Sequence, residues 1–208
     1  MEKLLLNTFP GLTLSDRQTN LFQDVYVERV VVEQDKNRVS IKLVSNHVIP
    51  YREMIRLEDN IGRAFAPTGY EVTVEDRFRL SDQYTPEIFW KEYRDSILLQ
   101  LKEEDILQFN MFYHGESHVE EGTLYLCCDD DSLFRARETE VIQKIQRIFK
   151  TKAGFEIGME IRYQEPEERK EEKNTRVLYR STPSGIREVS AGEVNNGFST
   201  DSGQAGMA

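Results

Sequence analysis

The clearest pattern of hydrophobic and polar positions lies between residues 86 and 103. Apolar residues recur there at every fourth position, and charged residues occupy the opposite side. The repeating apolar positions are Phe89, Tyr93, Ile97 and Leu101. Thr85 can cap the first turn, and Pro86 suits the first helical position, where an N–H group would have no partner. We therefore predict an amphipathic helix over residues 86–103, about 25 Å long.

The chain before this helix alternates between helix-like and strand-like patterns. Two β-rich runs separated by a short polar turn predict a hairpin, with one helix before it and a longer helix and a strand after it. The predicted elements are a helix capped by Ser15 or Asp16, strands over 25–34 and 37–45, a helix after Pro50 and a strand over 70–78. Residues 1–79 should thus form a first α-β-β-α-β module, with helices on one face of a small sheet.

Residues 80–165 are predicted to form a second module, whose first element (the founding helix) is the helix over 86–103. The other predicted elements are a helical segment over 104–114, a polar loop over 115–121, a central strand over 122–128, a helix ending at Phe149 and a closing strand over 155–163. The closing order of helix and then strand suggests a plan related to the first module, and one interpretation is a KH-like shape. The module lacks the G-x-x-G loop with which KH domains clamp a nucleic-acid backbone.

Beyond residue 165 the composition changes. A charged run is followed by Ser, Gly, Asn and Thr with few large apolar residues, which cannot bury enough apolar surface to fold. We expect residues 166–208 to be a disordered linker or tail. The predicted fold class is therefore α+β, with two small modules, each a short β-sheet packed against helices, followed by this tail.

The overall charge disfavours a nucleic-acid ligand. The chain has 27 basic and 37 acidic side chains, a net charge of −10, which is the wrong sign for tracking phosphates. One helix carries the candidate basic stripe, partly neutralised by Glu138 and Glu140, and its members are Arg135, Arg137, Lys144, Arg147 and Lys150. This stripe keeps open an alternative function, an accessory module that positions template or single-stranded DNA.

No residue pattern predicts a catalytic, cofactor or metal site. His114 and His118 stand four residues apart, but Gly115 between them opposes the helix that would bring both rings to one metal. The three aspartates at 129–131 precede a helix, where acidic side chains cap free N–H groups. Cys127 and Cys128 lie in an apolar run without a basic neighbour that would lower a thiol pKa, so core packing is the better interpretation.

The sequence also predicts a cytoplasmic protein without a membrane segment. No apolar stretch reaches the length of a transmembrane helix, and the short leucine cluster at residues 4–6 is shorter than the apolar region of a signal peptide. Two adjacent cysteines would point to opposite faces of a strand, so we expect no structural disulfide between them.

Two aromatic residues at the start of the founding helix are candidates for binding a partner. Tyr84 and Trp90 are of the residue types that dominate interface hot spots, although both also suit the core of the second module. The apolar face that includes Ile88 and Phe89 is wider than one sheet face requires, which favours exposure of one or two of its residues.

The same stretch resembles a known family. QYTPEIFWKEYRDSILLQLKEED, followed by FNMF at residues 109–112, resembles the N-terminal region of the PolC-type DNA polymerase III alpha subunit of bacteria. The likeness runs with gaps from Phe9 to Pro166 and includes VERVVVEQDKNRVSIKLVSNHVIP. It covers the two small modules that precede the OB-fold and the catalytic parts of that family, so we expect the chain to be a fragment or an early stop.

The resemblance implies a role in DNA replication. The full-length family protein is a DNA-directed DNA polymerase with a 3′–5′ exonuclease, and the resembled region is non-catalytic and needs no cofactor. Its expected role is protein–protein interaction with replisome proteins, and the clamp-loader tau subunit is the expected partner. Another expected contact is with the rest of the polymerase chain, which would follow this fragment on its C-terminal side.

Overall fold

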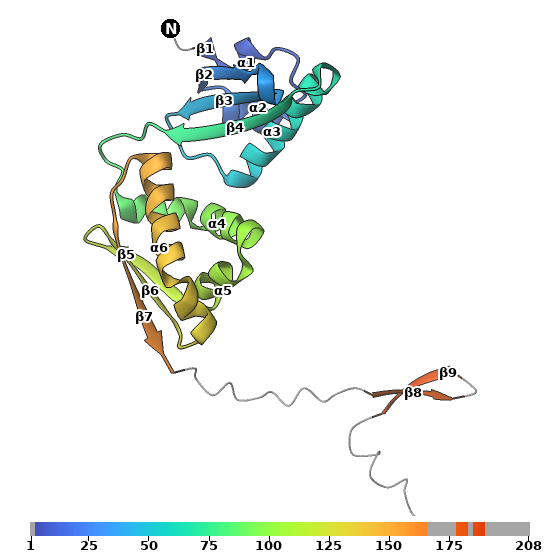
Figure 1. Cartoon of the computed structure of the whole chain (residues 1–208), viewed down its shortest axis with the longest axis vertical. Coiled ribbons are helices and arrows are strands. Elements are labelled where there is room, and N and C mark those ends of the chain that lie inside the picture. The colour runs from blue at the N-terminus through green and yellow to red at the C-terminus, as the bar shows by residue number, and fades with distance from the viewer. Residues whose placement is uncertain (1–2, 166–177, 183–184, 190–208) are drawn as a thin grey trace, which may run out of the picture. The chain divides into compact units, whose positions relative to one another are not determined.

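Two small sheets, each covered by helices, make up most of the protein, confirming the predicted α+β fold (Figure 1). The computed structural model describes residues 3–165, 178–182 and 185–189. The part up to Glu165 forms one compact unit. Its elements are β1 (Lys3–Leu4), α1 (Leu5–Thr8), α2 (Asp16–Phe22), β2 (Val25–Glu33), β3 (Arg38–Ser45), α3 (Tyr51–Phe65), β4 (Glu71–Phe78), α4 (Pro86–Glu104), α5 (Ile106–His114), β5 (Glu116–Glu120), β6 (Thr123–Asp129), α6 (Ser132–Ala153) and β7 (Gly158–Gln164). Short 3-10 turns at Gln34–Lys36 and Ala66–Thr68 follow β2 and α3.

The first sheet has the order β1-β2-β3-β4. Strands β2 and β3 form the predicted antiparallel hairpin, and β4 returns parallel to β3 after the crossover helix α3. The hydroxyl oxygen of Ser15 caps α2 and accepts a bond from the N–H of Gln18, as the sequence predicted for this helix start. Strand β1 and helix α1 were not expected, because two and four residues are too short for a periodic pattern.

The second sheet has the order β5-β6-β7, with β6 in the predicted central position. One prediction was wrong here, because Glu116–Glu120 forms β5 rather than a polar loop. This strand pairs antiparallel with β6 through a tight turn at Glu121 and Gly122, whose φ angles of 48° and 72° suit a two-residue hairpin. Its exposed and half-buried residues alternate, and the polar half of that alternation led to the loop assignment.

The two sheets share one connection pattern. In each, an antiparallel hairpin is followed by a crossover helix and then by a strand parallel to the second hairpin strand. Helices α4, α5 and α6 cover one side of the second sheet (Figure 1). Two predicted caps are present, since Thr85 accepts from the Ile88 N–H and Asp131 accepts from the Leu133 N–H. Gly154 ends α6 in the left-handed conformation.

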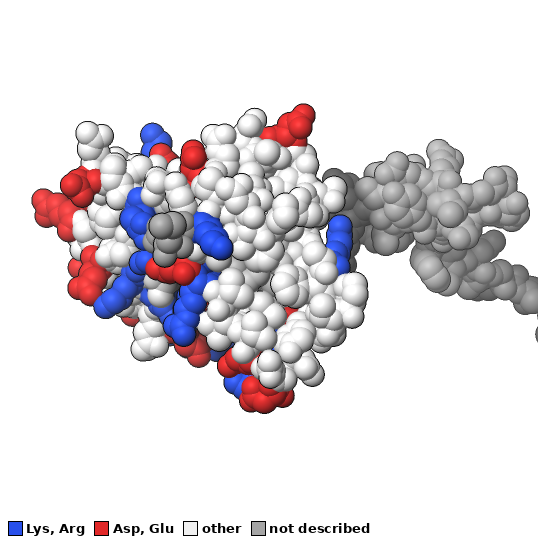
Figure 2. Space-filling view, turned by 90° about the horizontal axis from the view of Figure 1, so that it is seen from above, with Lys and Arg blue, Asp and Glu red and all other residues white. Residues whose placement is uncertain are grey.

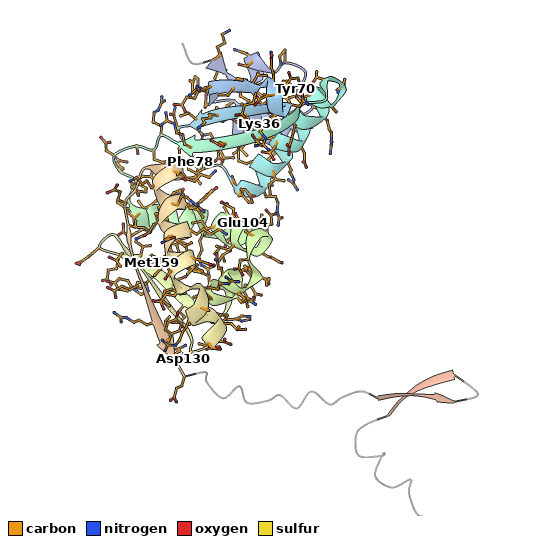
Figure 3. All side chains as sticks on the ribbon, in the orientation of Figure 1. Lys36, Tyr70, Phe78, Glu104, Asp130 and Met159 are labelled. Carbon is orange, nitrogen blue, oxygen red and sulfur yellow. The ribbon has the colours of Figure 1, made fainter. Side chains whose placement is uncertain are left out.

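Helix α4 joins the two sheets through a cluster of buried aromatic rings. Phe78, labelled in Figure 3, ends β4 and contacts Phe89 and Tyr93 of α4 at centroid distances of 6.2 and 5.4 Å. Phe89 also meets Phe149 of α6 edge to face at 5.0 Å. Because these rings belong to one core, the two sheets pack as one unit. The division into separate domains at residues 79 and 80 stays a prediction.

A buried ion pair crosses the same junction. Lys152, near the end of α6, donates to Oδ1 of Asp76 on β4, and only 4% of the Asp76 side chain is exposed. The second carboxylate oxygen of Asp76 is buried and has no hydrogen-bond partner among the described residues. A carboxylate in this position needs its cation, since an unpaired buried charge is strongly unfavourable.

The C-terminal part differs from the expected disordered tail in ten residues. Strands β8 (Leu178–Thr182) and β9 (Gly185–Val189) pair antiparallel. Both contain strand-favouring residues such as Tyr179 and Ile186. The polar composition of the tail as a whole nevertheless predicted disorder. The other residues for which a disordered tail was predicted lie outside the described ranges. Within those ranges no helix is long and apolar enough to cross a membrane.

Gly115 provides a test of the packing between α5 and the second sheet. A Cβ atom there would lie 2.4 Å from the Met111 carbonyl oxygen and 2.6 Å from that of Cys127. Gly115→Ala should therefore destabilise the protein by about 1–3 kcal/mol in urea unfolding, the usual cost of overpacking. Gly62→Ala is the control, because it lies in α3 with open space around it and should stabilise by about 0.5–1 kcal/mol. Equal effects of the two substitutions would contradict the described packing.

The ion pair between Asp76 and Lys152 gives a second test. Lys152→Met leaves a buried carboxylate without its cation and should cost about 3–5 kcal/mol of unfolding free energy. Adding Asp76→Asn to this variant should recover most of the loss, because the charge is then removed. Lys150→Met is the matched control, since its ion pair with Glu156 is exposed and should change stability little. Similar losses for Lys152→Met and Lys150→Met would show that the pair does not join the sheets.

Candidate protein-docking surface

The two aromatic residues proposed for partner binding lie in different environments. Trp90 is only 5% exposed and packs against Phe112 and Phe149, at 5.8 and 6.3 Å between ring centroids. Tyr84 is half-buried, and its hydroxyl donates to the Glu92 carboxylate. That hydrogen bond, with burial and the carboxylate charge, raises the pKa of Tyr84 to about 12. Of the two, only Tyr84 has a partly exposed side chain.

The five residues of the predicted basic stripe do not form a free cationic surface. Lys144 is buried and bonds Glu104 at 2.6 Å, and both Glu104 and Asp105 lie at the junction of α4 and α5. The other ion pairs are Arg135 with Asp130 at 2.6 Å, Arg137 with Asp105 at 3.3 Å and Glu140 at 3.0 Å, and Lys150 with Glu156 at 2.8 Å. Arg147 is exposed. The sequence showed Glu138 and Glu140 beside the stripe, but tertiary packing brought the acids of α4 and α5 against it.

The His and Cys residues considered as catalytic or metal-binding candidates are held in contacts within the fold. His118 lies on β5 and stacks on Tyr125 at 5.4 Å. Cys128 is buried, which raises its thiol pKa to about 11, and Cys127 donates to Gln164. Among residues 3–165 and the two later strands, no group of three or more His, Cys, Asp or Glu side chains could hold a metal ion.

The exposed face of the first sheet carries charges of both signs. Lys42 pairs with Glu75 at 3.1 Å, Arg38 pairs with Glu71 at 3.6 Å, and Arg77 bonds Glu28. Arg29 lies opposite Lys42 in the strand register. Figure 2 shows Lys and Arg side chains gathered on one part of the surface, with Asp and Glu side chains among and beside them. Most of these cations are locally neutralised.

A groove between the first sheet's helices and α4 and α5 has a different character. Its apolar part is formed by Leu98 and Leu99 of α4 and by Phe109 and Tyr113 of α5. Phe109 and Tyr113 stack at 5.0 Å, and Tyr113 is 63% exposed. Ile106, which is 52% exposed, precedes Phe109 by three residues on α5. The i, i+3, i+7 spacing of Ile106, Phe109 and Tyr113 places them on one helix face.

Basic side chains surround this groove. Arg17 of α2, Arg52 and Arg56 of α3 and Lys102 of α4 line it, with Glu53 and Asp95 as the acidic residues. Glu53 is buried and already accepts bonds from Arg56 at 2.7 Å and Gln18 at 3.2 Å. Arg17 and Arg52 have no carboxylate within ion-pairing distance in the described residues.

The amino-acid sequence alone did not predict this groove. The pattern of residues 104–114 predicts a helical segment with apolar residues, but it does not separate the buried face, with Met111 and Phe112, from the exposed one. The spacing of Ile106, Phe109 and Tyr113 was the available signal. Its partners on α2 and α3 are distant in sequence, so no local pattern could have indicated them.

Comparison with known proteins finds one similarity, in the first part of the chain. Residues 6–75 match the family described as DNA polymerase III polC-type N-terminus I. This range begins in α1 and ends within β4, so it covers nearly all of the first sheet and its helices. No curated protein and no solved structure matches the chain. The first sheet with its helices is therefore similar to the N-terminus I region of polC-type DNA polymerase III.

Proposed function

We propose that this chain is a non-catalytic protein-interaction region of a PolC-type DNA polymerase III alpha subunit, which acts in bacterial DNA replication in the cytoplasm. In this proposal it docks replisome proteins, and the clamp-loader tau subunit is the first partner to test. DNA polymerase and 3′–5′ exonuclease activities would belong to the rest of the polymerase chain.

The match of residues 6–75 to the polC-type N-terminus I family carries this proposal. The groove beside α5 supports it, because Ile106 and Tyr113 are large, exposed and on one face of α5, and exposed apolar patches commonly mark protein interfaces. The net charge of −10 also suits a protein partner better than a nucleic acid.

Capture of purified tau by the immobilised 208-residue chain tests the proposal. We expect retention at micromolar concentration, with an unrelated protein of similar net charge as the control surface. Tyr84→Ala tests the anchor suggested by the sequence and should weaken retention if Tyr84 contacts tau. Complete absence of clamp-loader subunits from the retained fraction would contradict the proposed partner.

The second candidate function is a module that positions template or single-stranded DNA. The gathered Lys and Arg side chains in Figure 2 favour it, and Arg29, Lys42 and Arg77 are cations of the first sheet's exposed face. Fluorescence anisotropy with a labelled single strand at low salt tests it. Because the chain is acidic and most of these cations are paired, we expect no binding, and a salt-dependent rise in anisotropy that Arg29→Glu removes would support this function instead.

A further inference from the structure

The groove lined by α2, α3, α4 and α5 has the apolar surface that a partner helix requires. Leu98 and Leu99 provide aliphatic surface, and the stacked rings of Phe109 and Tyr113 provide aromatic surface beside it. The exposed positions from Ile106 to Tyr113 extend over about two turns of α5, or roughly 10 Å. Binding of an amphipathic helix commonly uses a few large anchors at this spacing in a groove between helices.

The charges at the edges of the groove indicate the sign of the charge that a partner should carry. Arg17 and Arg52 lie on the side of the first sheet, and Lys102 lies on the opposite side, where its ammonium group is 5.5 Å from the centroid of the Phe109 ring. The acidic residue Glu53 is neutralised by Arg56. Asp95 is the other carboxylate of the groove, so its lining is locally cationic on a strongly acidic protein.

These features favour an acidic peptide over a nucleic acid. A nucleic acid long enough to stack on Phe109 and Tyr113 would extend beyond the groove. It would be repelled there by the negative potential of a chain with net charge −10. A short acidic segment interacts mainly with nearby charges, because the Debye length is about 8 Å at physiological salt. The aliphatic side chains of Leu98 and Leu99 also suit Leu or Phe side chains better than bases.

We propose that this groove binds a short acidic amphipathic helix of a partner protein. The apolar residues of that helix would pack on the exposed face of α5, and its carboxylates would pair with Arg17, Arg52 and Lys102. The proposal rests on the protein-interaction function proposed above and specifies where and by what chemistry the partner docks. The anchors are Ile106, Phe109 and Tyr113.

The test uses the full chain and two labelled helical peptides. One peptide has Leu and Phe on one face and Glu elsewhere, and the other has Lys in place of each Glu. In fluorescence anisotropy we expect saturable binding of the acidic peptide and at least tenfold weaker binding of the basic one. Arg17→Glu with Arg52→Glu should weaken acidic-peptide binding by about tenfold or more, as loss of charge complementarity commonly does.

Two control variants distinguish the groove from general effects. Arg63→Glu changes an exposed residue of α3, the helix that carries Arg52, at a position outside the groove. It should leave the affinity for the acidic peptide within about twofold of that of the unmodified chain. Tyr113→Ala should weaken binding about tenfold, whereas Val32→Ala, an exposed apolar position on β2, should not. Equal effects of Arg52→Glu and Arg63→Glu, equal binding of both peptides, or no saturable binding of the acidic peptide would overturn the proposal. Displacement of the acidic peptide by a single-stranded oligonucleotide of similar affinity would also overturn it, in favour of a nucleic-acid ligand.

The same variants separate this inference from the proposed function. If the unmodified chain captures tau and the Arg17→Glu, Arg52→Glu variant captures it equally well, the proposed function stands and the groove is not the docking site. If the chain binds the acidic peptide but captures no clamp-loader subunit, the groove stands and the proposed partner fails.

Discussion

The burial of helix α4 against both sheets is the constraint on which the rest of the structure depends. Phe89 contacts rings from three other parts of the chain, at Phe78, Phe149 and Phe155, and Tyr93 stacks on it at 5.2 Å. Large aromatic side chains remove much apolar surface from water, and edge-to-face pairs add to that gain. Because one helix supplies rings to both halves, their positions relative to each other are fixed by the core itself.

Polar contacts across the junction make this arrangement specific. The backbone N–H of Tyr51, in the first turn of α3, donates to the Ser96 hydroxyl at 3.1 Å, and Asp76 bonds Lys152. Buried polar groups of this kind are unfavourable unless they are paired, so slippage of α4 against the first sheet would leave them unsatisfied. The groove between α3 and α5 exists because the two halves meet in this one way.

The surface chemistry follows from that packing. Many cations have an acidic neighbour, including four residues of the α6 stripe, as an excess of carboxylates in the chain allows. At the groove, Glu53 bonds Arg56 and leaves Arg17 and Arg52 unpaired in the described residues, in the same lining as the exposed ring of Tyr113. A local cationic and aromatic surface on an acidic molecule is suited to selecting a small acidic segment.

The sequence by itself determined most of the local structure, although not β5, whose polar residues predicted a loop. The four-residue apolar repeat with Thr85 and Pro86 specified α4, the alternation in residues 37–45 specified β3, and the family resemblance of the first module was confirmed by the match of residues 6–75. Only the tertiary structure decided which apolar and charged side chains stay free. Packing buried Trp90 and left Tyr84 partly exposed, it paired four of the five stripe cations with carboxylates, and it brought Arg17 and Tyr113 into one groove. Such contacts join residues far apart in the chain, and local periodicity carries no information about them.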